Sequence, residues 1–384
     1  MLAGIIALLF FNSLFQSGFI TNYSFFNLIL QTFSTYNWYV LICSTSKLLI
    51  LAIPKKIRIF LNYFIGPVLF VVMAYSIYRQ VQKQNDWQQS WSVIRDSFTS
   101  IKVWKLLVVL LLMLANWGIE AKKWQVLLKH VMTMPFFTAF KSVLSGVAFT
   151  MITPNRMGEF IGRVFYVSEG ERLRAATLTV VGSVSQMMVT LMAGAGGLLV
   201  LRKNLLAAQD LKGLSFLWVN GLLIGSILVL LFITIFYFRL SWLVRVAERV
   251  KSLQKVIFVI SLLKEVQKME LIRILVLSMI RFAVFTSQYL LLFSLFGVDI
   301  PWWQGCCAVS VLFLILAAIP LPGIAELGVR AKASVSLFGL FSSNLFGIAA
   351  CTGAIWLINI ILPAVLGSLL ILNVKLFNKN EPNE

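Results

Sequence analysis

The sequence is poor in the side chains that most soluble enzymes use for catalysis. It contains one histidine, His130, and only 14 acidic residues among 384, and charged residues of both signs make up 12%. A single histidine argues against most histidine-based metal sites and against histidine-dependent lipid phosphatases and acyltransferases. No G-x-x-x-x-G-K-[ST] run is present, so the usual ATP-binding loop is missing as well. We therefore expect no cofactor and no metal site.

Cysteine is also scarce. The cysteines are therefore expected to act as small hydrophobic side chains within helices rather than to form metal or redox sites. The four cysteines form no C-x-x-C pair and lie in apolar stretches, at Cys43, Cys306, Cys307 and Cys351.

Long hydrophobic runs, by contrast, are abundant. Hydrophobic residues make up 60% of the chain, and the mean hydropathy is +0.91. Several runs reach the roughly 20 residues that an α-helix needs to cross a ~30 Å hydrocarbon core. The sequence therefore predicts an all-α polytopic membrane protein. The candidate spans are 58–79, 105–119, 175–201, 214–238, 274–297 and 345–372.

The formal net charge of +19 would suggest a nucleic-acid partner in a soluble protein. In a membrane protein it is better explained by basic loops that face an anionic cytoplasmic leaflet, so we expect no nucleic acid. The linker 239–273 carries eight basic residues, and a short tail follows Lys375. The positive-inside rule places both in the cytoplasm. We expect a multi-pass protein of the bacterial inner membrane with a cytoplasmic C-terminus.

Two further apolar segments, 138–163 and 305–338, are each interrupted by a proline-containing polar cluster. Counting crossings from the linker 239–273 makes the first segment start and end inside and the second start and end outside. Such a segment is a re-entrant hairpin or an even number of crossings, and the roughly 16 apolar residues of the first are short for a full span. Each is therefore predicted to be a re-entrant hairpin. The order span, span, hairpin, span then occurs twice in opposite orientation, an inverted repeat with about six full spans plus two broken hairpins. Basic residues in loops 80–104 and 202–213, which this count places outside, argue against it.

This count predicts a single transmembrane domain, 55–375, whose repeat halves are about 58–201 and 214–372. Residues 376–384 are predicted to be a cytoplasmic tail. Residues 1–54 do not fit the pattern of spans and are predicted to be an extension, either translated upstream of the true start or loosely packed.

Each predicted hairpin carries charged residues beside its proline-glycine break. The first reads MITPNRMGEFIGR at 151–163 and the second IPLPGIAELGVRAK at 319–332, and in each a glutamate precedes an arginine by four residues. Such a pair shares one helical face and can neutralise itself when no ligand is bound. Charges at membrane depth are costly and usually mark a substrate path. The predicted substrate-binding residues are Pro154, Arg156, Gly158, Glu159, Arg163, Pro322, Gly323, Glu326 and Arg330.

The arginines could hold a phosphate through forked hydrogen bonds, and the two glutamates could receive an amine or a sugar hydroxyl. Hairpins that enter from opposite faces are expected to meet near the bilayer midplane. Arg156 or Arg163 would then lie close to Glu326. Arg330 would lie close to Glu159. The alternative is that these residues lie at the membrane interface, where they cap and orient helices.

One further charge stands inside a predicted span. Arg281 lies more than a turn from the start of 274–297 and has no acidic neighbour in sequence, and Gln288 falls on the same helical face. We include Arg281 among the predicted substrate-binding residues, with snorkelling towards the cytoplasmic side as the alternative. No residue is predicted to be catalytic.

The motif residues resemble a known family. The pattern Pro-x-Arg-x-Gly-Glu-x-x-x-Arg, from Pro154 to Arg163, is similar to the signature of the membrane region of lysylphosphatidylglycerol synthases and their flippase-like relatives. The cluster from Pro320 to Arg330 resembles that family's later proline-glycine-glutamate motif. The resemblance covers roughly 55–375 and implies a lipid-translocating membrane domain with the motif residues beside the headgroup path.

Two departures from that family affect the expected function. Its aminoacyl-transferring members carry a large soluble domain after the membrane region, whereas this chain ends at Glu384, so we expect no aminoacyl transfer. Relatives often have an acidic residue near the start of the span after the first hairpin, where this chain reads Ser183, Val184, Ser185 and Gln186. The second departure leaves the transported lipid open.

We expect a lipid translocase that moves a phosphate-bearing headgroup through a polar cavity lined by the two hairpins, without covalent chemistry. Its partners would be the membrane and a phospholipid or a polyprenyl-phosphate-linked lipid, and a homo-oligomer is left open. The enzymatic alternative is an integral membrane polyprenyl-phosphate glycosyltransferase, for which Asp86 and Asp96 are acidic candidates in a loop. The non-catalytic alternative is an accessory membrane subunit.

Overall fold

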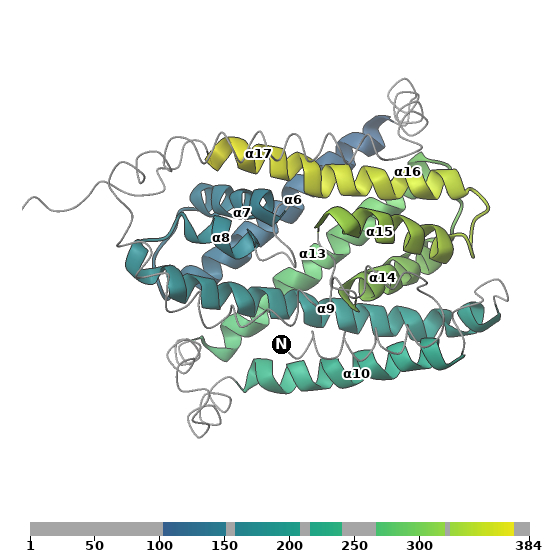
Figure 1. Cartoon of the computed structure of the whole chain (residues 1–384), viewed down its shortest axis with the longest axis horizontal. Helices are drawn as coiled ribbons and strands as arrows, with labels where there is room; N and C mark the ends of the chain where they lie inside the picture. The colour runs from purple at the N-terminus through teal and green to yellow at the C-terminus, as the bar shows by residue number, and fades with distance from the viewer. Residues whose placement is uncertain (1–102, 151–157, 208–215, 240–265, 319–322, 372–384) are drawn as a thin grey trace, which may run out of the picture. The chain divides into compact units, whose positions relative to one another are not determined.

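The computed structural model describes five stretches of the chain, all within one structural unit, 70–374. They are 103–150, 158–207, 216–239, 266–318 and 323–371. Every regular element in these stretches is helical (Figure 1). The predicted span 58–79, the extension 1–54 and the tail 376–384 lie outside the described residues.

The first half of the described chain contains two long helices separated by a pair of shorter ones. Its elements in chain order are α6 (Val103–Leu128), α7 (Phe136–Thr150), α8 (Gly158–Val164), η2 (Glu169–Glu171) and α9 (Arg172–Ala207). The helices α7 and α8 cover the predicted hairpin 138–163 and pack against each other. The helix α9 extends the predicted span 175–201 at both ends.

The helix α6 is longer than the sequence predicted. The predicted span 105–119 stops at the charged residues that follow, whereas α6 continues to Leu128. Glu120 and Lys123 are 2% and 1% exposed, and Lys123 Nζ lies 2.7 Å from Glu120 Oε2, one helical turn away. The prediction was wrong because pairing within a helix lowers the cost of burying charge, which a hydropathy pattern does not register.

After α10, the second half has the same order of long and short helices. Its elements are α10 (Phe216–Phe238), α13 (Lys268–Leu295), α14 (Trp302–Ala318), α15 (Gly323–Phe338), α16 (Leu345–Trp356), η5 (Leu357–Ile361) and α17 (Leu362–Ile371). The helices α14 and α15 cover the predicted hairpin 305–338 and are in contact. The π-helical turn η5 ends two residues before Pro363, which has no N–H with which to continue the regular hydrogen-bond pattern.

The helix α13 begins before the predicted start of its span at residue 274. The Glu270 side chain accepts a hydrogen bond from the Gln267 N–H at 3.2 Å, which satisfies a backbone donor at the helix start. Regular helix therefore begins at Lys268, inside the predicted linker 239–273.

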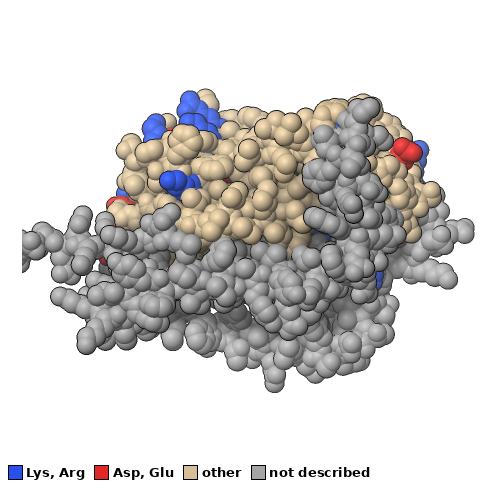
Figure 2. Space-filling view, turned by 90° about the horizontal axis from the view of Figure 1, so that it is seen from above, with Lys and Arg blue, Asp and Glu red and all other residues tan. Residues whose placement is uncertain are grey.

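Four helices in the described ranges are long and apolar enough to cross a membrane. They are Trp104–Leu128, Glu169–Leu205, Val219–Phe238 and Gly347–Ile371. Leu228 and Leu231 of α10 are 61% and 56% exposed, and charged side chains are sparse on the described surface that Figure 2 shows. Apolar surface of this extent requires lipid or another apolar partner. The chain is an all-α membrane protein, as predicted.

The helices α6 and α13 pack against each other and run obliquely through the middle of Figure 1. The pair α7 and α8 lies on one side of them, and the pair α14 and α15 lies on the other. The helix α9 contacts α8 and α14, whereas the run from α16 to α17 contacts α15 and α7. Each of these two runs therefore packs on both short-helix pairs.

Glycines permit the closest of these helix contacts. A Cβ added at Gly197 of α9 would lie 2.6 Å from the Cys307 carbonyl oxygen of α14. One added at Gly367 of α17 would lie 2.0 Å from the Leu144 carbonyl oxygen of α7. Small residues of this kind let helix backbones approach each other inside membranes.

Candidate functional site

Glu120 on α6 is the centre of a buried ion-pair cluster. Its Oε1 accepts a hydrogen bond from Arg163 Nη2 of α8 at 2.8 Å, and its Oε2 accepts one from Arg281 Nη1 of α13 at 2.6 Å. Lys123 Nζ lies 2.7 Å from the same Oε2 and also donates to the Gly182 carbonyl of α9 at 3.3 Å. One carboxylate therefore links α6, α8 and α13, and Lys123 extends the cluster to α9.

Arg163 is shared by two carboxylates. The same Nη2 also donates to Glu159 Oε1, one turn earlier on α8, so the two charges of the first motif pair on their own helix. Arg163 is 1% exposed, whereas the Glu159 side chain is 21% exposed. The Trp124 ring of α6 packs against the guanidinium, with its centroid 5.4 Å from Cζ. Glu159 is therefore the more accessible end of the cluster.

A glycine contact between α7 and α8 brings Arg163 to α6. A Cβ added at Gly162 would lie 2.5 Å from Gly146 Cα, so the two backbones touch. Ser142 Oγ of α7 also donates to the Arg163 carbonyl at 3.2 Å. The helix α8 has only seven residues, too few to be stable alone, so the position of the guanidinium depends on α7.

Arg281 lies inside the helix bundle rather than snorkelling to its surface. Besides Glu120, its Nε donates to Asn116 Oδ1 at 2.8 Å, and its Cζ lies 5.1 Å from the Trp117 ring centroid. Asn116 Nδ2 is in turn 3.5 Å from Asn359 Oδ1 of η5, which extends the polar contacts to the last helical run. The Arg281 side chain is 12% exposed. Its acidic partner is distant in sequence, which is why no local pattern revealed it.

Sequence reasoning missed Asn116, Glu120 and Lys123. These residues are spaced four and three apart, so they share one face of α6. All three are buried, with exposures of 0%, 2% and 1%. A polar stripe at helical spacing that runs past the end of an apolar stretch would have indicated this buried polar face. The prediction stopped at the end of the apolar stretch and did not follow the stripe.

The second motif is described in part. Arg330 of α15 is 5% exposed, and its Nη1 donates to the Tyr289 hydroxyl of α13 at 3.4 Å. Gly323 is the first residue of α15, and Glu326 lies on the same helix with its side chain outside the described part. In the first motif, Gly158 is buried and begins α8. The described residues do not include Pro154, Arg156 and Pro322.

The structure thus brings together two of the predicted substrate-binding arginines, Arg163 and Arg281, on a carboxylate that was not predicted. The predicted contacts of Arg163 or Arg156 with Glu326 stay predictions, because they involve atoms outside the described part. The predicted contact of Arg330 with Glu159 stays a prediction as well.

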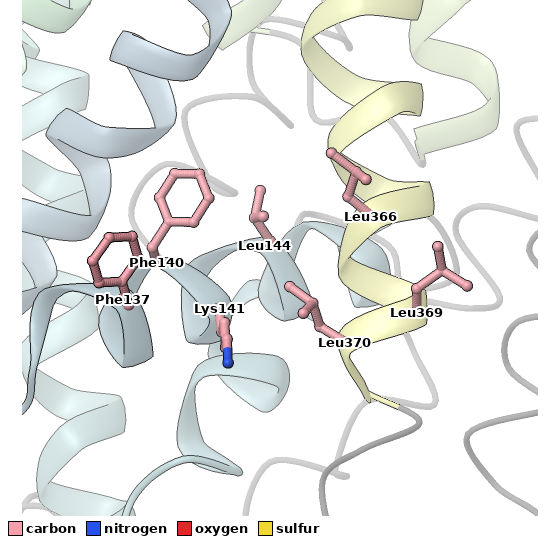
Figure 3. A pocket seen from close by; sticks show the side chains of 7 residues that line it. All are labelled: Phe137, Phe140, Lys141, Leu144, Leu366, Leu369 and Leu370. Carbon is pink, nitrogen blue, oxygen red and sulfur yellow. The ribbon is translucent and has the colours of Figure 1, made fainter.

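An apolar groove lies between α7 and α17 (Figure 3). Its volume is about 460 Å³, and its described lining consists of Phe137, Phe140, Lys141, Leu144, Leu366, Leu369 and Leu370. Lys141 is exposed and is the charged member of this lining. The groove therefore joins a hydrocarbon surface to one cation, a composition that suits an apolar chain with an anionic end.

A second ion pair lies before the predicted span 274–297. His130 Nε2 and Glu270 Oε2 are 2.6 Å apart and connect the residues after α6 to the first turn of α13. Burial raises the pKa of the Glu270 carboxyl, but hydrogen bonds from His130 and from the Gln267 N–H leave that pKa below its usual value. In the stretches that the structure describes, no group of three or more His, Cys, Asp or Glu side chains could hold a metal ion.

Comparison with known proteins gives one family. Residues 59–367 match the family model described as the lysylphosphatidylglycerol synthase TM region. No curated protein sequence matches the chain. The matched range contains both motifs and every residue of the Glu120 cluster.

Proposed function

The chain belongs to the lysylphosphatidylglycerol synthase TM region family, and on that basis we propose that it is a lipid translocase that moves a phosphate-bearing headgroup across the bilayer. The observation that carries this proposal is the buried cluster in which Arg163 and Arg281 share Glu120. Charges held at membrane depth are costly and usually line a substrate or ion path. A forked guanidinium matches the oxygen atoms of a phosphate as well as it matches a carboxylate.

The contacts between helices support an inverted repeat. The first-half helix α9 packs on α14 of the second half, and the second-half helix α17 packs on α7 of the first. The glycines at these two contacts, Gly197 and Gly367, are 170 positions apart, the same offset as the predicted spans that begin at 175 and 345. When the last helix of each half packs on the other half in this way, the two halves would form one central path with α6 and α13 at its centre.

Corresponding side chains support the same repeat. Tyr289 follows Glu120 by 169 positions and Arg330 follows Arg163 by 167, so the two pairs occupy corresponding places. In the first half Arg163 donates to Glu120, and in the second Arg330 donates to Tyr289. Each hairpin arginine therefore contacts a corresponding position on the long helix that precedes its own short-helix pair.

Within this path, Arg163 can exchange one carboxylate for a phosphate without losing all of its partners. Glu159 is the more exposed of its two carboxylates and would be the first to be replaced, while Glu120 keeps the guanidinium in place. The groove between α7 and α17 would hold the apolar chain of the lipid beside Lys141. The protein would lie in the bacterial inner membrane with its C-terminus in the cytoplasm and would carry out no covalent chemistry.

Purified protein in liposomes tests the proposal. We expect it to move fluorescent phospholipid between leaflets, and we expect Glu159→Gln and Glu326→Gln to slow the movement while leaving membrane insertion unchanged. Glu169→Gln, at a side chain that is 59% exposed in η2, is the control. Full transport by both motif variants would place the path elsewhere. Glycosyl transfer from a polyprenyl-phosphate sugar in the same vesicles would favour the enzymatic alternative, and inactivity in both assays would favour an accessory subunit.

A further inference from the structure

Among the described residues, three N–H donors without an acceptor lie beside the Glu120 cluster. The buried nitrogens without a hydrogen-bond partner include Trp117 Nε1, Trp124 Nε1 and Arg163 Nε. The two tryptophans flank Glu120 on α6, and their rings lie 5.1 Å from Arg281 Cζ and 5.4 Å from Arg163 Cζ. A buried indole N–H normally finds a partner, so three unpartnered donors beside one ion-pair cluster need an explanation.

A fourth unpartnered donor belongs to the last helical run. Trp356 Nε1 has no partner, and Trp356 is 2% exposed. It lies three residues before Asn359, which contacts Asn116 beside Arg281. The two unpartnered amide oxygens in the described part, Gln186 Oε1 and Gln288 Oε1, are neutral and supply no negative charge.

The cluster also contains more cations than carboxylates. Among the described side chains, the cations of Lys123, Arg163 and Arg281 pair with the two carboxylates of Glu120 and Glu159, which leaves a surplus of one positive charge. Both oxygens of Glu120 already accept from cations. A net charge buried in this way is unfavourable unless a counter-ion joins it.

The second half adds no carboxylate at the equivalent position. Where Glu120 stands in the first half, the second half has Tyr289, whose hydroxyl meets Arg330. The two half-sites therefore differ in charge although the arginine is present in both. A ligand that contacts both half-sites would meet the Glu120 carboxylate in the first and the Tyr289 hydroxyl in the second.

We propose that the Glu120 cluster binds a phosphate that carries one negative charge and no cationic substituent, so that the lipid moved is anionic rather than zwitterionic or cationic. This inference rests on the proposed translocation function. One negative charge would balance the surplus, and the phosphate oxygens would accept from the unpartnered nitrogens. An ammonium group on the same headgroup would restore the surplus, because Glu120 and Glu159 are both already counted against the three cations.

The test compares headgroups of different charge in phosphatidylcholine liposomes. Fluorescent phosphatidylglycerol is anionic, fluorescent phosphatidylethanolamine is zwitterionic and lysylphosphatidylglycerol is cationic. We expect the anionic lipid to move faster by roughly tenfold, the factor that ~1.4 kcal/mol of headgroup discrimination gives. Equal rates, or a faster cationic lipid, would overturn the inference and leave translocation intact. Movement of none of the lipids would instead refute the proposed function.

Binding is measured separately, so that it decides the inference even without transport. In detergent, phosphatidylglycerol should raise the thermal midpoint of the protein and phosphatidylethanolamine should not. Trp124→Phe keeps the ring beside Arg163 and removes one unpartnered donor, so its midpoint without lipid should be equal or higher while its apparent affinity for phosphatidylglycerol falls roughly tenfold. Trp104→Phe, at a side chain that is 53% exposed, is the matched control.

Inorganic phosphate separates a lipid headgroup from a free anion. Stabilisation by phosphate alone that equals the effect of phosphatidylglycerol would assign the site to a free anion and overturn the lipid assignment. Equal stabilisation by the anionic and zwitterionic lipids would overturn the anion site itself. A lipid effect that is retained in full by Trp124→Phe and by the corresponding Trp117→Phe would show that the unpartnered donors take no part.

Discussion

At the scale of single residues, Glu120 compensates more charge than any other described side chain. Three cations approach its two oxygens, and among the described residues only Arg163 has a second carboxylate, Glu159. Removing one partner of a buried ion pair is far more costly than replacing the whole pair, because the remaining charge is left without compensation. The cluster should therefore be sensitive to its single shared acid.

Glu120→Gln is expected to destabilise the protein by about 3–5 kcal/mol, since the amide keeps the shape and leaves the cations without their carboxylate. Thermal unfolding in detergent measures the effect. Lys122→Gln is the control, because Lys122 is an exposed neighbour on the same helix. Its side chain donates a hydrogen bond to Gln125 and takes no part in the cluster. If the two variants unfold at the same temperature, the cluster is not buried in the native protein.

Glu270 predicts a dependence of stability on pH. Its folded pKa lies below the ordinary value of 4.5, so its pair with His130 contributes stability above that value. This contribution is lost as the pH falls through the lowered pKa. Glu270→Gln should therefore reduce the loss of stability between about pH 5 and pH 3, as followed by thermal unfolding at each pH. The control Glu171→Gln, at a side chain that is 39% exposed, should keep the wild-type profile.

At the scale of helices, contact between backbones decides where the charged residues lie. The seven-residue helix α8 is held on α7 through Gly146 and Gly162, and α17 packs on α7 through Gly367. Neither contact leaves room for a Cβ. The chain thus uses glycine within helices, where it lowers intrinsic helix stability, to gain close packing.

Adjacent glycines on α9 allow a matched test of this packing. A Cβ at Gly197 would lie 2.6 Å from the Cys307 carbonyl oxygen, whereas one at Gly196 would meet nothing within 4 Å. Gly197→Ala should lower the unfolding free energy by about 1–3 kcal/mol, because α9 and α14 must separate. Gly196→Ala should leave stability equal or raise it by up to about 1 kcal/mol through better helix propensity. Equal effects of the two variants would contradict the α9–α14 contact.

At the scale of the whole molecule, the two halves share an order of helices and differ in charge. The helices α6 and α13 meet at the centre, and each half sends its last helical run to the short-helix pair of the other half. This exchange agrees with the proposed inverted repeat, in which the two predicted hairpins would enter from opposite sides of the membrane.

The side assignment can be tested by labelling single cysteines in a cysteine-free background. Asp299→Cys, at an exposed residue between α13 and α14, should react with a membrane-impermeant reagent added from outside. Glu171→Cys in η2 should react only after the membrane is opened. Labelling of Glu171→Cys from outside would contradict the crossing count that produced the inverted repeat.

The sequence by itself determined the features that depend on local pattern. Apolar runs of sufficient length predicted a membrane protein and the positions of its long helices, because a chain in lipid must satisfy its backbone polar groups within each helix. The spacing of four between Glu159 and Arg163 predicted their pairing, because such residues share one helical face. Proline and glycine in 151–163 predicted an interruption of this segment, and the described helix α7 ends at Thr150 whereas α8 begins at Gly158.

Only the tertiary structure decided which charges form the site. Arg281 has no acidic neighbour in sequence, and its partner Glu120 is 161 positions away on another helix. Glu120 itself follows the last residue of the predicted span 105–119. The cost of burying its carboxylate is offset by ion pairs with Lys123, Arg163 and Arg281, which lie on three helices. The energy of a buried charge depends on every neighbour at once, and those neighbours are set by how the helices cross rather than by any local run of residues.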